Sequence, residues 1–203
     1  ITRCGIFIAS NPVVPESFGL QRILPQLKTL NFTKSSYGHS TFVDTNSQKL
    51  LLKFLEMLAI THKDQLKSFT CTKSIFMNAP SINAFAFESL AILNTGPSNV
   101  RIAPIINRQY CLKELDLSTT FIMDDVLMEI INLKLLKTLR INCEGISMKC
   151  FSLISNMDLQ ELHLESKRKS HWFLPLMTTL KFESVKKLSL NLPYMELPLE
   201  KLH

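Results

Sequence analysis

The chain has 203 residues, of which 46% are hydrophobic and 20% charged, a composition that supports a sizeable buried core and excludes an intrinsically disordered protein. Its net charge of +6 is spread along the sequence and does not gather in one stripe, so we expect no nucleic-acid partner. No apolar run approaches the roughly 20 residues that span a bilayer, so we expect no membrane partner either. Because the sequence opens at Ile1, we expect it to be a fragment of a longer chain.

The five cysteines form no CxxC pair and no regular framework. This pattern predicts free thiols in a reducing compartment, and it argues against a disulfide scaffold or a zinc site. The first residues also lack the order of a basic segment followed by an apolar core that marks a signal peptide. We therefore expect a cytoplasmic or nuclear protein.

A six-residue pattern recurs along the chain in the order apolar, Lys or Gln, polar, apolar, polar, apolar. Six copies of this hexad begin at residues 27, 66, 112, 136, 159 and 185, and two weaker copies begin at residues 1 and 87. Successive copies are 21–26 residues apart, except for one step of 39 residues. Self-similarity at such a period is typical of proteins built by stacking one structural unit.

Each hexad predicts a short parallel strand, because alternate residues of a strand point to opposite faces and the chain must then cross back outside the sheet. Residues 33–48 read as an inserted polar loop, which accounts for the long step. An amphipathic helix follows, and its apolar face is formed by Leu51, Phe54, Leu55 and Leu58. After the hexad at residue 87, residues 94–97 and Pro104 leave room for only a short turn.

Helical returns are also predicted after the later hexads. Asp124 or Asp125 suits the first turn of one helix, whose apolar positions are Val126, Leu127, Ile130 and Ile131. Ser147 can cap the next helix, whose apolar positions are Met148, Phe151 and Ile154. The outer layer of the seventh unit is predicted to contain Trp172, Phe173, Leu176 and Leu180.

The hexad and its period resemble the L-x-x-L-x-L head of leucine-rich repeats. The resemblance covers essentially the whole chain and is nearest to the ribonuclease-inhibitor-like and cysteine-containing subtypes. It implies an α/β right-handed solenoid, or horseshoe, with a concave parallel sheet and outer helices, formed by residues 1–203 as a single domain of about eight repeats. The motif's later Asn or Cys position is poorly kept, since it is occupied by Ser35, Ser74, Thr95, Thr120, Glu144 and Lys167. We therefore expect irregular repeat geometry there.

The hexad at residues 112–117 and the stretch from Ile122 to Ile130 together resemble the strand, turn and I-x-D-x-x-L-x-x-I helix of F-box leucine-rich-repeat proteins. Residues 145–147 echo that turn in the next unit. In that family the repeats hold a substrate, while an F-box on the N-terminal side docks into a cullin-RING ubiquitin ligase. The resemblance therefore implies a substrate-recognition module whose adaptor contact would come through an upstream F-box that this sequence does not show.

In a solenoid of this kind, the third and fifth residues of each hexad point outward on the concave sheet and form the default binding surface. Small neutral residues occupy these positions in the N-terminal half, whereas charge gathers in the C-terminal half. We predict that a protein partner binds there, in contact with Glu114, Asp116, Arg140, Glu161, His163 and Glu165. The alternative is an ordinary solvated strand face.

No enzymatic function is predicted. His163 lies between Glu161 and Glu165, but no second His or Cys is expected beside it, so we predict neither a metal site nor an acid-base site. Gly-rich phosphate loops and the common hydrolase motifs are absent, and we expect no cofactor. Cys4 and Cys71 fall at inward hexad positions and are expected to pack in the core.

Two other functions stay open at this point. The chain could be a non-catalytic intracellular adaptor or regulatory scaffold that recruits no ligase. It could also be an extracellular receptor ectodomain, although the odd number of cysteines and the lack of disulfide-bearing caps argue against this.

Overall fold

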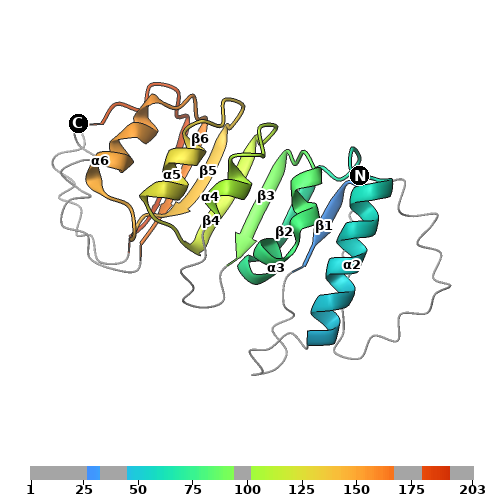
Figure 1. The fold of residues 1–203 in the computed structure, drawn as a ribbon. Coiled ribbons are helices and arrows are strands. Elements are labelled where there is room, and N and C mark those ends of the chain that lie inside the picture. The colour runs from blue at the N-terminus through green and yellow to red at the C-terminus, as the bar shows by residue number, and fades with distance from the viewer. Residues whose placement is uncertain (1–26, 33–44, 94–101, 167–179, 193–203) are drawn as a thin grey trace.

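The computed structural model describes residues 27–32, 45–93, 102–166 and 180–192. Strands and short helices alternate along these segments (Figure 1). In chain order they are β1 (Thr29–Asn31), α2 (Thr45–Thr61), β2 (Ser68–Thr72), α3 (Lys73–Asn78), η2 (Pro80–Ala84), β3 (Ser89–Leu93), α4 (Ala103–Ile106), β4 (Glu114–Phe121), α5 (Asp124–Ile130), β5 (Thr138–Asn142), α6 (Met148–Phe151), η3 (Ser152–Asn156), β6 (Glu161–Glu165) and β7 (Lys187–Asn191).

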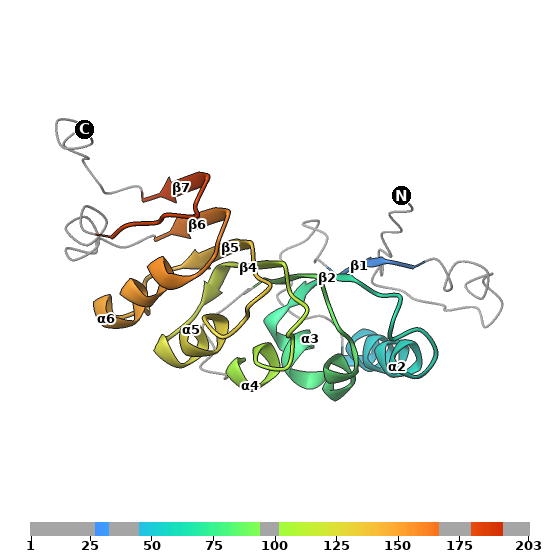
Figure 2. The same ribbon diagram turned by 90° about the horizontal axis from the view of Figure 1, so that it is seen from above.

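The strands form one seven-stranded parallel sheet in which they follow one another in chain order from β1 to β7. All labelled helices lie in a layer on one side of this sheet (Figure 2). The predicted α/β class with a parallel sheet is thus confirmed, and each hexad from residue 27 onward contributes a strand. The hexad at residues 1–6 lies outside the described residues.

A repeated backbone contact sets the register between neighbouring strands. The carbonyl of the second hexad residue accepts hydrogen bonds from the second and third amides of the next hexad. Lys28 O, for example, accepts from Lys67 N and Ser68 N, both at 2.9 Å. Lys137 O accepts from Gln160 N at 2.8 Å and from Glu161 N at 3.0 Å. Equivalent hexad positions consequently lie side by side across the sheet, as the sequence alignment of the hexads predicts.

The core lies between the sheet and the helices and is built from inward rows of hexad side chains. The row at the fourth position is buried from β1 to β6 and consists of Leu30, Phe69, Leu90, Leu115, Leu139 and Leu162. Phe69 also stacks on Phe87, with 5.3 Å between their ring centroids. On β7 the row ends at Leu188, whose exposed fraction is 45%. Burial in the middle of the sheet is therefore deeper than at its C-terminal edge.

The helical returns agree with the sequence in most places and differ in two. Leu55 and Leu58 of α2 are buried, as are Val126, Leu127 and Ile130 of α5. However, α2 begins at Thr45, so the loop predicted over residues 33–48 extends too far, and residues 33–44 lie outside the described residues. Met148 was expected in the core but is 54% exposed, because α6 spans only four residues and Met148 is its first. Most of the outer layer predicted for the seventh unit also lies outside the described residues.

Several side chains satisfy backbone groups where the strands end. Thr120 Oγ1 donates a hydrogen bond to the carbonyl of Ile92, one strand away. Asn142 Oδ1 accepts from Glu144 N at 2.9 Å, and Cys143 Sγ lies 3.3 Å from the carbonyl oxygen of Glu165. Burial raises the pKa of the Cys143 thiol to about 12, so the thiol stays protonated. It can therefore donate a hydrogen bond to the Glu165 carbonyl. Thr120, Asn142 and Cys143 thus each satisfy a backbone group at or near the end of a strand.

Asp124 connects two neighbouring units at the start of α5. Its Oδ1 accepts a hydrogen bond from Ser147 N at 2.7 Å, and Ser147 Oγ in turn caps α6 by accepting from Cys150 N at 3.2 Å. Partial burial acts to raise the pKa of the Asp124 carboxyl, but the hydrogen bonds from Ser147 and Cys150 outweigh it and lower the pKa. The charged carboxylate therefore stabilises the junction between α5 and α6.

Leu139→Ala tests the buried row. We expect it to lower the free energy of unfolding by about 2–5 kcal/mol, because it opens a cavity among fully buried side chains. Leu188→Ala changes the equivalent residue of β7, which is partly exposed, and should cost about 1 kcal/mol or less. Chemical denaturation measures both. A cost below about 0.5 kcal/mol for Leu139→Ala would contradict the inward register of β5.

Asp124→Ala tests the junction between α5 and α6. We expect a loss of about 1 kcal/mol near neutral pH, because Ser147 N loses its acceptor. The folded pKa of Asp124 lies below its unfolded value of about 3.9, so this contribution is present above pH ~4 and disappears as the pH falls through the folded pKa. Denaturation of the wild type and the variant across acid pH measures the difference. The exposed Asp64→Ala serves as control, and an equal loss in both variants would refute the junction role.

Candidate functional site

The sheet has one face that none of the labelled helices covers, and we call it the open face (Figure 2). The third and fifth hexad residues lie on it, because alternate residues of a strand point to opposite sides and the fourth residues are buried. The six residues predicted to bind a partner all belong to three neighbouring strands. Glu114 and Asp116 lie on β4, Arg140 on β5, and Glu161, His163 and Glu165 on β6. The structure therefore brings the predicted set together.

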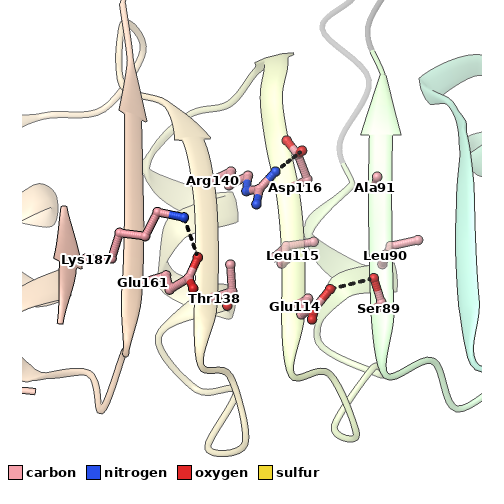
Figure 3. Close-up of a pocket in the computed structure, with 10 residues that line it drawn as sticks. All are labelled: Ser89, Leu90, Ala91, Glu114, Leu115, Asp116, Thr138, Arg140, Glu161 and Lys187. Carbon is pink, nitrogen blue, oxygen red and sulfur yellow. Dashed lines mark hydrogen bonds and ion pairs between the residues drawn. The ribbon is translucent and has the colours of Figure 1, made fainter. Parts of the chain in front are cut away.

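Parallel register arranges these side chains in two rows. Asp116, Arg140 and His163 are direct neighbours in one row. Glu114, Thr138 and Glu161 are direct neighbours in the other, which continues to Lys187 on β7. Figure 3 shows the second row with Thr138 between the two glutamates. Two carboxylates are thus separated by a strand that carries only a small hydroxyl side chain at that level.

Asp116 is held mainly by its own strand. Its Oδ1 accepts hydrogen bonds from Ser118 N at 3.0 Å and from Ser118 Oγ at 2.7 Å. The other carboxylate oxygen lies 3.9 Å from Nη1 of Arg140 on the next strand. This is a long, half-exposed ion pair, which orients the guanidinium more than it stabilises the fold.

Glu161 has two neighbours that favour its charged form. Its Oε2 lies 3.3 Å from Nε2 of His163 and 3.6 Å from Nζ of Lys187. The hydrogen bond with His163 lowers the pKa of the Glu161 carboxyl; partial burial opposes this, and the positive charge of Lys187 adds to the lowering. Glu161 is therefore a carboxylate near neutral pH, joined to side chains on both sides.

Glu114 has a different environment. Its Oε2 accepts a hydrogen bond from Ser89 Oγ on β3 at 3.2 Å, and the residue is exposed. Glu165, at the end of β6, is half-buried, and its backbone carbonyl accepts hydrogen bonds from the Cys143 amide and thiol. The two glutamates thus lie at opposite ends of the charged region, one toward β3 and one beyond His163.

A shallow hollow of about 450 Å³ lies on the open face over the middle strands (Figure 3). It is lined by Ser89, Leu90, Ala91, Glu114, Leu115, Asp116, Thr138, Arg140, Glu161 and Lys187. Four of the six predicted residues line it, whereas His163 and Glu165 lie beside it. Ser89, Ala91, Thr138 and Lys187 were not in the predicted set, although their third or fifth hexad positions already place them on this face.

Three further features of the described residues bear on the expectations from the sequence, namely metal ligands, membrane-spanning helices and buried thiols. These residues contain no group of three His, Cys, Asp or Glu side chains placed to hold a metal ion. Across the same segments, no helix is long and apolar enough to cross a membrane. Cys71 is fully buried, and burial raises the pKa of its thiol, which agrees with the predicted core position; Cys4 lies outside the described residues.

Comparison with known proteins gives no match. No family model, curated protein or solved structure resembles this chain closely enough to be counted as related. The functional interpretation therefore depends on the residues and geometry of the open face.

His163→Ala, which removes the side-chain donor to Glu161, tests the electrostatics of this face. We expect the pKa of the Glu161 carboxyl to rise, because the hydrogen bond with His163 is the main cause of its lowering. Lys187→Gln should raise the same pKa less, since Lys187 contributes less. NMR titration of the Glu161 carboxyl carbon in the wild type and the two variants measures the three pKa values and shows which variant raises the pKa more. A larger effect of Lys187→Gln would show that the His163 contact does not form in solution.

Proposed function

We propose that this chain is a leucine-rich-repeat solenoid and that it acts inside the cell as a non-catalytic protein-binding module. The observation that carries the proposal is the open face of β4–β7, where charged side chains of both signs surround a hollow of about 450 Å³. An array of charges fixed by sheet register can select a partner through complementary potential. The partner would lie across the strands on this concave side.

The repeat geometry supports the solenoid. Consecutive units contribute consecutive parallel strands, and the same hexad positions pair at every step from β1 to β7. The helices described between β1 and β6 that Figure 2 labels all lie on the same side of the sheet. Stacked units that bury their apolar sides against their neighbours are the defining feature of solenoid proteins.

The charge pattern supports a protein partner over a nucleic acid. Glu114, Asp116 and Glu161 all line the hollow, and they would repel phosphates. The two cations there, Arg140 and Lys187, are each next to one of these carboxylates. Mixed charges of this kind suit the polar rim and side-chain chemistry of another protein.

We further propose that the bound protein is the substrate of an F-box type ubiquitin ligase. Support comes from the likeness of residues 112–130 to F-box leucine-rich-repeat proteins. In those proteins the repeats bind the substrate, and a separate F-box contacts the ligase. The alternative is an adaptor or scaffold that recruits no ligase. Co-precipitation of the intact protein with cullin-RING adaptor subunits distinguishes the two. Recovery of such a subunit supports the ligase role, and its absence supports the adaptor.

A triple charge reversal tests the open face. Glu114→Lys, Asp116→Lys and Glu161→Lys together should reduce partner capture from cell extract by at least about tenfold, through loss of complementary charge. The matched control is Glu56→Lys, Asp64→Lys and Glu129→Lys, which makes the same change of net charge away from the hollow. Melting temperatures of all three proteins should agree within a few degrees. Equal capture by both variants would refute binding at this face.

A further inference from the structure

The carboxylates that line the hollow differ in how their charge is balanced. Asp116 has Arg140 beside it, and Glu161 has His163 and Lys187. Glu114 accepts a hydrogen bond from the neutral hydroxyl of Ser89, and no ion pair of the described residues includes it. The negative charge of Glu114 is therefore left for a partner to neutralise.

The hollow next to Glu114 leaves room for a positively charged group of a partner. Glu114, Thr138 and Glu161 occupy the same level on adjacent strands. Because neighbouring strands are about 4.8 Å apart, the two glutamates begin roughly 10 Å from one another, with the short Thr138 side chain between them. Figure 3 shows this gap, with the Ser89 and Glu114 pair on one side and the Glu161 and Lys187 pair on the other.

The sign of the charge on this part of the face is opposite to that of the chain. The whole sequence has a net charge of +6. On β4–β7, by contrast, the open face carries the carboxylates of Glu114, Asp116, Glu161 and Glu165 against the cations Arg140 and Lys187. This local excess of carboxylates attracts a cationic segment.

We propose that the partner protein presents an arginine whose guanidinium lies over Thr138 and pairs with Glu114. This inference depends on the proposed protein-binding function and names the chemistry that the open face recognises. The planar fork of a guanidinium matches a carboxylate with two parallel N–H donors. Its remaining N–H groups face the hydroxyl of Thr138 and the carboxylate of Glu161. The compact ammonium of a lysine would reach fewer of these acceptors.

Selection from a random peptide library tests the proposal without a known partner. The full chain is immobilised, and bound peptides are sequenced after selection. We expect arginine to be enriched among them, and enrichment to disappear when Glu114→Gln is used, because the amide keeps the size of the side chain and the contact with Ser89 but removes the charge. Glu56→Gln, the same change on the outer helix α2, should keep the enrichment.

A double-mutant cycle then locates the arginine. The affinity of one selected peptide is compared with that of the same peptide carrying citrulline, a neutral analogue, in place of arginine. Either change alone, citrulline or Glu114→Gln, should weaken binding about fivefold, and the two together should weaken it little further. Fully multiplicative losses would overturn the pairing, since they would mean that the arginine contacts another group.

The outcomes separate this inference from the function on which it rests. The selected peptides could show no arginine enrichment and yet bind the triple charge-reversal variant more weakly than the wild type. That result would overturn the arginine contact and leave the open face as the binding site. Peptides that bind the wild type and the triple variant equally would overturn the proposed function itself. Circular dichroism of Glu114→Gln checks that the fold is intact, so that lost binding reports the missing charge.

Discussion

The structure depends on one backbone constraint, the in-register stacking of parallel hexads. A carbonyl at the second position of each hexad accepts from two amides of the next, so every strand enters the sheet at the same level. Rows of like positions follow from this. The fourth residues become a continuous apolar row between sheet and helices, and the third and fifth residues become rows on the open face. Core and candidate site are therefore two sides of the same hydrogen-bond pattern.

The same constraint explains why charge is concentrated at one end of the open face. The fifth-position row begins with Asn31, Thr70 and Ala91 and continues with Asp116, Arg140 and His163. Because the row is fixed by register, each side chain has neighbours on the adjacent strands as well as partners on its own strand, such as Ser118 for Asp116. Ion pairs across strands, such as Asp116 with Arg140, tie up most of this charge internally. In the proposed binding mode, recognition depends on the side chains that form no ion pair of this kind, such as Glu114.

Sequence patterns predicted the strands, their register and the placement of the six candidate residues on one face, because strict alternation and a shared lysine or glutamine make the hexad recognisable. They failed where local composition is ambiguous. Residues 45–48 are polar and read as loop, yet they form the first turn of α2. Thr120 occupies the poorly kept motif position, and its hydrogen bond to the carbonyl of Ile92 on β3 depends on the three-dimensional approach of the two strands. Lys187 was left out of the predicted set, although its third hexad position already places it beside Glu161 on the next strand.

The I-x-D stretch that resembles F-box leucine-rich-repeat proteins also has a structural use in this chain. Ile122 is buried, and Asp124 accepts from Ser147 N of the next unit. Gly145 lies against this turn so closely that an added Cβ would come within 2.3 Å of the Ile122 carbonyl oxygen. These residues act in packing one unit on the next, and none of them reaches the hollow. The stretch therefore packs one unit on the next, whereas Glu114 and Thr138, through which we propose that a partner is recognised, lie on the opposite side of the sheet.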